Sequence, residues 1–170
     1  LNKAQAKSLN TALNTQFSAM LEQKVNNAKA LLKRYALDEF LRDSSIKILN
    51  NEVFLLAKQY AQSTNTWQQH LSPSSIKFLN ILSSTPNTHD AIAQLRHKYE
   101  KKQLTLKNDF FNQVELNPLT TEQRLAVIRD NDKNLVLAAA GTGKTSVMVA
   151  KSLDLIACNI AKPEQILVLA

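Results

Sequence analysis

Residues 134–146 limit what this chain can fold into more than any other part of the sequence. They begin with a short apolar run at 135–137, which predicts a buried strand. Three alanines and the segment Gly141-Thr-Gly-Lys-Thr145 follow, and a helical pattern then extends over 146–157. A strand, a loop of small residues, Gly-Lys-Thr and a helix follow one another in this order in the phosphate-binding loops of nucleotide hydrolases.

Each residue type in this loop has a chemical reason. Backbone N–H groups can wrap around phosphate oxygens only where the side chains are small or absent. The helix that follows directs its N-terminus, with unpaired N–H groups and partial positive charge, at the same phosphates. Lys144 would contribute a full positive charge to the β- and γ-phosphates, and Thr145 would offer a hydroxyl to a magnesium ion. The pattern therefore predicts a site for a nucleoside triphosphate with Mg²⁺.

The chain contains only two glycines, Gly141 and Gly143, and both stand in this loop. Glycine adopts backbone angles that other residues avoid, and it lets a ligand approach the main chain closely. We therefore expect unusual backbone angles at these two positions. Ala138 stands at the first position of the motif, where glycine is usual. An ordinary strand–turn–helix connection is the alternative interpretation.

Composition indicates a globular chain without a disulfide framework. The 170 residues suffice for one domain or two small ones, and 44% of them are hydrophobic, so we expect a packed core. The single cysteine, Cys158, cannot form an internal disulfide, which is typical of a cytosolic protein, and we expect it to be a small buried hydrophobe. His70, His89 and His97 have no partner at metal-ligand spacing, so no zinc site is predicted.

The charge of the chain favours a polyanionic partner. The formal net charge is +7, and residues 1–115 carry most of it, with 15 Lys and Arg against 9 Asp and Glu. The sequence contains no run of 18 apolar residues, so no membrane span is predicted, and no signal peptide is visible. The chain starts at Leu1 and ends within an apolar run at 166–170, which suggests a piece of a longer protein.

Residues 1–114 predict an all-α region. Apolar residues recur at three- and four-residue steps over 3–35, which predicts one long amphipathic helix. Further helices are predicted from Asp43, from the cap Ser72-Pro73, and over 90–114. Trp67 stands in a polar stretch that we expect to be a loop. Its ring is predicted to pack on the edge of the helical core, with stacking on a nucleic-acid base as the alternative.

The predicted helix over 90–114 is rich in cations that do not gather on one face. One interpretation is solvated charge on an exposed helical arm. The other is a surface for single-stranded or duplex nucleic acid. The cations in question are Arg96, Lys98, Lys101, Lys102 and Lys107.

Residues 115–170 predict a different kind of structure. Pro118 marks a boundary, and Thr120-Thr-Glu-Gln123 is a capping-box pattern that starts a helix. Residues 131–134 predict a turn into the strand at 135–137, and residues 166–169 predict a second buried strand after the helix of the phosphate loop. A strand, a helix and a strand in this order form a parallel crossover unit. The predicted fold class is therefore α/β, with an all-α region over 1–114 followed by the start of a P-loop domain over 115–170.

Two segments together are more specific than a phosphate loop alone. Leu116-Asn-Pro-Leu-Thr-Thr-Glu-Gln123-Arg-Leu-Ala126 lies upstream of Ala138-Ala-Ala-Gly-Thr-Gly-Lys-Thr145, and Gln123 precedes Lys144 by 21 residues. This pair resembles the glutamine motif and the phosphate loop of UvrD/Rep-type superfamily 1 helicases. The resemblance covers residues 110–170, and over 1–109 it is mostly compositional.

The resemblance implies a RecA-like parallel α/β domain that binds ATP and Mg²⁺. It also implies a cytoplasmic enzyme that unwinds duplex DNA 3′ to 5′, with single-stranded DNA and duplex junctions as partners and no membrane. Gln123 would hydrogen-bond adenine, because its amide donates and accepts at once; alternatively it is only the reciprocal half of the capping box. Lys144 and Thr145 would serve catalysis, with Thr145 on the magnesium. The residues implied to bind the nucleotide are Gln123, Ala138, Ala139, Ala140, Gly141, Thr142, Gly143, Lys144, Thr145 and Ser146.

Two other functions stay open at this point. One is a different P-loop ATP-binding protein, such as a kinase or a transport ATPase, against which the spacing of Gln123 argues. The other is a non-enzymatic module in which the helices of 1–114 dock a partner and the nucleotide site is vestigial. Intact Lys144 and Thr145 argue against the latter. The acidic motif, the arginines and the second core domain of the family are not within residues 1–170, and we expect them downstream.

Overall fold

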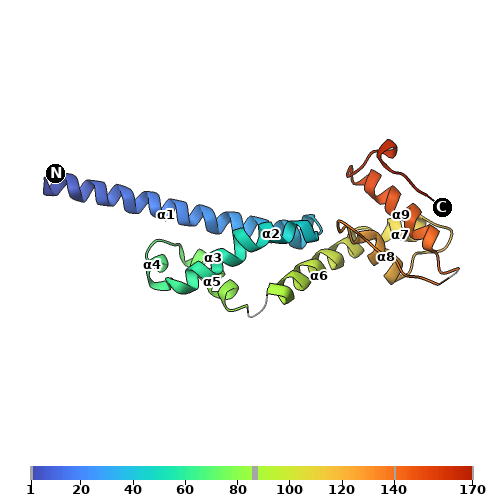
Figure 1. The fold of residues 1–170 in the computed structure, drawn as a ribbon, viewed down its shortest axis with the longest axis horizontal. Helices are drawn as coiled ribbons and strands as arrows, with labels where there is room; N and C mark the ends of the chain where they lie inside the picture. The colour runs from blue at the N-terminus through green and yellow to red at the C-terminus, as the bar shows by residue number, and fades with distance from the viewer. Residues whose placement is uncertain (1, 86–87, 140, 170) are drawn as a thin grey trace.

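The computed structural model describes residues 2–85, 88–139 and 141–169, and these residues form an elongated, helical molecule (Figure 1). α1 projects at one end, the C-terminal helices pack at the other, and α6 bridges the two (Figure 1). The elements in chain order are α1 (Lys3–Lys33), η1 (Arg34–Asp38), η2 (Asp43–Ser45), α2 (Ile46–Leu49), η3 (Asn50–Phe54), α3 (Leu55–Gln62), α4 (Thr64–Gln68), α5 (Pro73–Ser83), α6 (Thr88–Leu106), α7 (Asn108–Gln113), α8 (Thr121–Ile128), α9 (Lys144–Ala157) and η4 (Pro163–Gln165).

The long helix α1 confirms the periodicity of the first predicted helix. It begins at a capping box in which the Asn2 side chain accepts a hydrogen bond from the N–H of Ala4 at 2.7 Å. Its C-terminal half packs into the protein, whereas Leu9 and Leu13 in its N-terminal half are 53% and 55% exposed. No helix in the described part of the chain is both long and apolar enough to cross a membrane.

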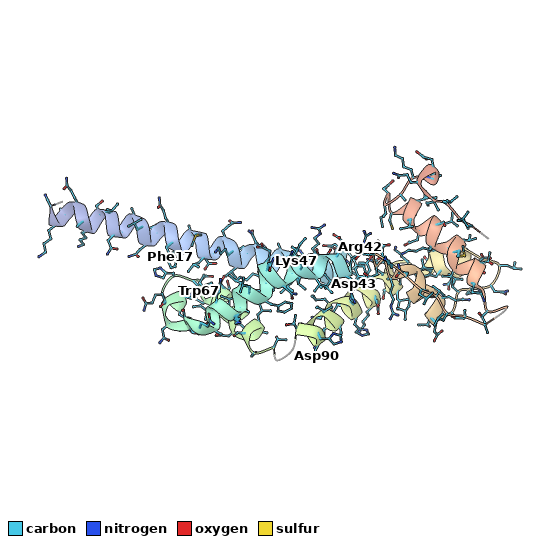
Figure 2. The ribbon with its side chains drawn as sticks, in the orientation of Figure 1. Phe17, Arg42, Asp43, Lys47, Trp67 and Asp90 are labelled. Atoms are coloured by element: carbon cyan, nitrogen blue, oxygen red, sulfur yellow. The ribbon has the colours of Figure 1, made fainter. Side chains whose placement is uncertain are left out.

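A first core joins α1 to the helices of residues 46–83. Leu49, Val53 and Leu79 are fully buried in it, and Tyr60 is nearly so. The Trp67 ring meets the Tyr60 ring edge-on at 6.0 Å between centroids, which confirms its predicted place at the edge of the core (Figure 2). The expected loop around it is wrong, because Trp67 belongs to the short helix α4.

A second core joins the middle of the chain to its C-terminal third. Phe40 and Tyr99 pack there with Phe111, and α8 and α9 add Val127 and Val147. The two cores meet where Phe40 enters the second and its neighbour Leu41 enters the first. Because Phe111 packs against α8 and α9, the second core extends across residues 114 and 115.

The single helix expected over 90–114 is wrong. The chain bends at Lys107 (φ −100°, ψ 16°), which separates α6 from α7. The bend turns Phe111 into the second core with no exposed surface and leaves Leu106 66% exposed. Burial of an aromatic ring therefore outweighs the continuity of the helix at this point.

The two predicted strands are also absent from the described residues. Residues 135–137 and 166–169 have no regular secondary structure, and Leu135, Leu137 and Leu167 are 84%, 84% and 81% exposed. A segment becomes a strand only when a neighbour pairs with its N–H and C=O groups, and no such pairing is present in the described residues. The described structure is therefore helical throughout, and the predicted parallel α/β part of the fold is not seen in it.

Candidate functional site: the loop between α8 and α9

The loop before α9 has the backbone that its two glycines predict. Gly141 has φ +76° and Gly143 has φ +83°, and in the described residues Asn159 (φ 54°) is the one non-glycine with a positive φ. Gly143 is the N-cap of α9, so the main chain turns directly from this left-handed residue into the helix. The first-turn N–H groups of α9 have no partner within the helix, and they carry its partial positive charge.

The side chains of the loop bind its own main chain. Lys144 Nζ donates to the carbonyl oxygens of Ala138 and Ala139, both at 2.8 Å, and the Thr142 hydroxyl donates to the Ala139 carbonyl at 2.7 Å. Thr145 is exposed in the first turn of α9, one position after Lys144. The ammonium group and the Thr145 hydroxyl are thus both at the surface of the loop.

Two further residues were predicted to bind the nucleotide, Ser146 and Ala140. Ser146 is half-buried in the first turn of α9. Ala140 lies outside the described residues.

Gln123 links the start of α8 to this loop. Thr120 and Gln123 form the predicted capping box, in which Gln123 Oε1 accepts from the Thr120 N–H at 2.8 Å. The same amide donates through Nε2 to the carbonyl oxygen of Thr142 at 3.0 Å. One amide proton and further acceptor capacity remain, because an amide carries two donors and two lone pairs.

The loop and α8 enclose a pocket of about 550 Å³, a size typical of small-molecule sites. It opens between Gln123 on one side and the loop with Lys144 on the other. A nucleoside triphosphate with Mg²⁺ suits these groups: the helix N-terminus and Lys144 are positive, and Thr145 offers a hydroxyl beside them. The residues present therefore fit the cofactors that the sequence predicted.

Some of the cations of α6 form ion pairs within the chain, and others do not. Arg96 pairs with Asp43 at 2.6 Å and Lys102 with Asp38 at 3.2 Å, so their charges are already used within the chain. Lys98 and Lys101 are exposed and take part in no ion pair with the described residues. Much of the basic character of this helix therefore stabilises the fold, and only part of it faces solvent.

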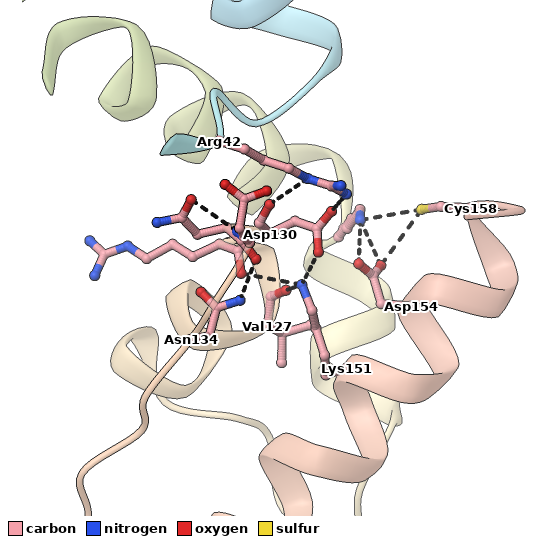
Figure 3. A network of polar contacts seen from close by, with 11 residues as sticks. Arg42, Val127, Asp130, Asn134, Lys151, Asp154 and Cys158 are labelled. Atoms are coloured by element: carbon pink, nitrogen blue, oxygen red, sulfur yellow. Dashed lines mark hydrogen bonds and ion pairs between the residues drawn. The ribbon is translucent and has the colours of Figure 1, made fainter. Parts of the chain in front are cut away.

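The fifth cation, Lys107, contacts both Asp154 and the cysteine Cys158. Its Nζ lies 2.6 Å from a carboxylate oxygen of Asp154, a side chain of α9 that is 6% exposed, and 3.4 Å from Cys158 Sγ (Figure 3). The predicted burial of Cys158 is wrong, because it follows the last residue of α9 and is exposed.

The Tyr99 side chain lies near this group of residues. Its pKa is raised to about 12, mainly because the phenol is buried and also because Asp154 is negatively charged.

Exchanging Gly143 for alanine is expected to cost more stability than the same exchange at Gly141. Both residues have positive φ, which costs a residue with Cβ about 1–2 kcal/mol. A Cβ on Gly143 would lie 2.5 Å from Gln123 Nε2, whereas a Cβ on Gly141 would meet nothing within 4 Å. The Gln123 side chain can shift away only by losing its bond to the Thr142 carbonyl, so we expect Gly143→Ala to lower the free energy of unfolding by about 0.5–1.5 kcal/mol more than Gly141→Ala. Urea denaturation of both variants measures this, and equal losses would show that Gln123 does not pack against Gly143.

Sequence reasoning missed the side chains that hold α8 and α9 together. Lys151 of α9 contacts the C-terminal end of α8, and Asp130 joins this contact. No local sequence pattern predicts the contacts of Lys151, since a lysine on a helix surface is most often solvated. Its partners come from other elements, so only the tertiary structure reveals it.

Comparisons with known proteins agree with the two motifs. The family model described as the UvrD/REP helicase N-terminal domain matches residues 119–170. DNA helicase IV of Escherichia coli (strain K12) is 50% identical over 80 residues, which are 46% of this chain and 12% of that protein. This match is longer than the segment 110–170, so the likeness extends upstream of residue 110, where the sequence predicted a mostly compositional likeness. No solved structure matches the chain significantly.

Two further relatives carry related names. The probable DNA helicase II homolog of Rickettsia conorii (strain ATCC VR-613 / Malish 7) is 41% identical over 56 residues, 33% of this chain and 9% of that protein. DNA helicase II of Rickettsia typhi (strain ATCC VR-144 / Wilmington) is 37% identical over 62 residues, 36% of this chain and 9% of that protein. The chain thus matches only about a tenth of the length of these relatives. Residues 119–170, which carry the glutamine motif and the phosphate loop, match the UvrD/REP helicase N-terminal domain.

Proposed function

We propose that this chain provides the nucleotide-binding start of an ATP-dependent DNA helicase that moves 3′ to 5′ along one strand. The observation that carries the proposal is the convergence of two motifs on one pocket. Gln123 lies 21 residues before Lys144 in the sequence, yet its amide donates to the carbonyl of Thr142 within the phosphate loop. The names of the relatives, all DNA helicases, support the substrate class.

Each residue of the pocket has a role in this proposal. Gln123 reads adenine with the donor and acceptor capacity that its bonds to Thr120 and Thr142 leave over. The N–H groups at the start of α9 and Lys144 hold the phosphates, and Thr145 holds magnesium. When bound through Thr145, Mg²⁺ would supply positive charge that neutralises the phosphates. The cellular setting is the cytoplasm, and DNA is the partner, with the exposed Lys98 and Lys101 as candidate phosphate contacts.

Exchanging Gln123 for alanine is expected to weaken ATP binding more than GTP binding. A glutamine amide matches the adjacent acceptor and donor of adenine, N7 and N6, which guanine does not present. Loss of one such pair corresponds to about 1–3 kcal/mol, so the preference for ATP should fall at least about fivefold. Competition binding of Mg²⁺-ATP and Mg²⁺-GTP to the 170-residue chain measures the preference.

Thr120→Ala is the matched control, because it removes the other half of the capping box and leaves the amide in place. Loss of a cap costs about 0.5–2 kcal/mol of stability in either variant. Only Gln123→Ala should change the ratio of the two affinities. Equal weakening of ATP and GTP would leave Gln123 as a cap and contradict its role in reading the base.

A further inference from the structure

Two short segments far apart in the sequence bind each other side by side. Residues 42–44 form the start of η2, residues 130–132 follow α8, and we call this pair of segments the junction. Arg42 donates from Nε to the carbonyl oxygen of Asp130 at 2.9 Å, and its Nη2 pairs with the Asp130 carboxylate (Figure 3). The guanidinium thus contacts both the main chain and the side chain of one residue, which fixes its orientation.

The next two residues of each segment continue the same pairing. The N–H of Asp43 donates to Asn131 Oδ1 at 2.8 Å, and Asn131 Nδ2 donates back to Asp43 Oδ2 at 2.8 Å. Ser44 donates from its N–H and its hydroxyl to the two carboxylate oxygens of Asp132, at 2.7 and 2.8 Å. Three consecutive residues therefore bind three others at a constant separation of 88 positions.

The junction is anchored on the helical region by α6. Arg96 donates to the carbonyl oxygen of Leu41 at 2.9 Å and pairs with Asp43 at 2.6 Å. Arg129, directly before the junction, donates to Glu100 of α6 at 2.7 Å. The segment that leads from α8 toward the phosphate loop is thus held by residues of 1–114.

On its other side the junction reaches α9 through Lys151. The Lys151 ammonium donates to the carbonyl oxygen of Val127 at 2.8 Å and to that of Arg129 at 3.2 Å, and it lies 3.2 Å from Asp130 Oδ1 (Figure 3). Carbonyl oxygens at the C-terminal end of a helix have no partner within it and carry partial negative charge, so a cation is favoured there. One side chain of α9 therefore fastens α9 to the end of α8.

Asp130 is the shared partner of both cations. Burial opposes its ionisation, but Lys151 and Arg42 outweigh burial and hold the pKa of the Asp130 carboxyl below its usual 3.8. A lowered pKa in the folded state means that the ionised carboxylate stabilises the fold above about pH 4, and that this stabilisation is lost as the pH falls. At neutral pH both contacts of Asp130 are therefore charged.

We propose that the junction and Lys151 position α8 against α9, and so set the spacing between the adenine and phosphate halves of the nucleotide site. The inference rests on the proposed function, because α8 begins with the turn that carries Gln123, and α9 begins at the phosphate loop. ATP touches both halves at once, so its affinity depends on their spacing. The helical region thereby controls nucleotide affinity through contacts that never touch the nucleotide, and Arg42, Asp130 and Lys151 are positioning residues.

The test compares two probes that use different parts of the site. Mg²⁺-ATP needs both halves, whereas inorganic tripolyphosphate with Mg²⁺ needs only the phosphate loop. We expect Arg42→Gln and Asp130→Asn to weaken ATP about tenfold, a free-energy change of about 1.4 kcal/mol, and to weaken tripolyphosphate less than about threefold. Titration calorimetry of the 170-residue chain gives both affinities, and circular dichroism confirms that each variant is folded.

Three comparisons make the test specific. Arg34→Ala removes an exposed ion pair with Glu39 in the same region and should change neither affinity. Arg42→Lys keeps the charge beside Asp130 and should restore most of the ATP affinity. Ser44→Ala removes only one bond of the junction and gives a milder variant if Arg42→Gln fails to fold; it should shift the ratio in the same direction.

Two outcomes would overturn the proposal. Equal weakening of ATP and tripolyphosphate in folded variants would mean that the junction only stabilises the chain, and unchanged ATP affinity would mean that it does not act on the site. A folded, unaltered chain that binds tripolyphosphate but gains nothing from the adenosine of ATP would refute the adenine half of the proposed function. The two failures are therefore distinguishable.

Discussion

Replacement of Lys144 by alanine is expected to lower the affinity of the chain for Mg²⁺-ATP by about 10²-fold and to leave the helical fold unchanged. Its ammonium lies at the surface of the loop and, within the part of the chain that the structure describes, binds the carbonyl oxygens of Ala138 and Ala139, at 2.8 Å each. A hydrogen bond to a charged group contributes about 1.5–3 kcal/mol, so two contacts to phosphate oxygens correspond to a change of at least about 10²-fold. In a longer protein with helicase activity, the same exchange should abolish ATP-driven strand displacement.

Lys47→Ala provides the control for this prediction. Lys47 is exposed on α2, outside the residues that line the pocket, so its loss changes the net charge equally without touching the site (Figure 2). Equilibrium titration with a fluorescent ATP analogue measures both variants. If Lys144→Ala bound ATP as tightly as Lys47→Ala did, the loop would not be a phosphate site.

Replacement of Phe111 by alanine is expected to lower the free energy of unfolding by about 3–5 kcal/mol. Phe111 is 0% exposed, its ring lies edge-on to that of Phe110 at 5.3 Å between centroids, and the Arg124 guanidinium stands 5.7 Å above it. Its carbonyl oxygen also accepts from the N–H of Leu119 at 3.1 Å. Domains are stable by only about 5–15 kcal/mol, so this exchange removes a large part of the total.

Phe17→Ala gives the comparison for a partly exposed ring. Phe17 of α1 is 37% exposed and meets the His70 ring edge-on at 5.0 Å, so its loss should cost about 1 kcal/mol or less (Figure 2). Urea denaturation followed by circular dichroism measures both exchanges. Similar losses for the two phenylalanines would contradict the burial of Phe111 in the second core.

The strands predicted at 135–137 and 166–169 show what a local sequence pattern cannot determine. Both segments are apolar throughout, as buried strands are, and both lack regular secondary structure in the described residues. A strand also needs a neighbour at hydrogen-bonding distance, which is a property of the surroundings and not of the segment. A helix supplies its own backbone hydrogen-bond partners. Helix predictions such as α1 and α8 therefore depend less on neighbouring segments.

The basic residues between 96 and 107 show the same distinction for charge. Counting Lys and Arg reveals an excess of positive charge, which favours an anionic partner. The count cannot show that Arg96 and Lys102 bind Asp43 and Asp38, or that Lys107 binds Asp154. These acidic partners stand 47 to 64 positions away in the sequence, so no local pattern links them.

Sequence patterns predict the features whose physical cause is local. The turn through Gly141 and Gly143 follows from backbone freedom, the start of α8 from the capping box of Thr120 and Gln123, and the face of α1 from helical periodicity. The bend at Lys107 and the junction between 42–44 and 130–132 depend instead on contacts made in the folded chain. In both, the energy comes from burial and ion pairs between residues distant in the sequence, and these exist only once the chain has folded.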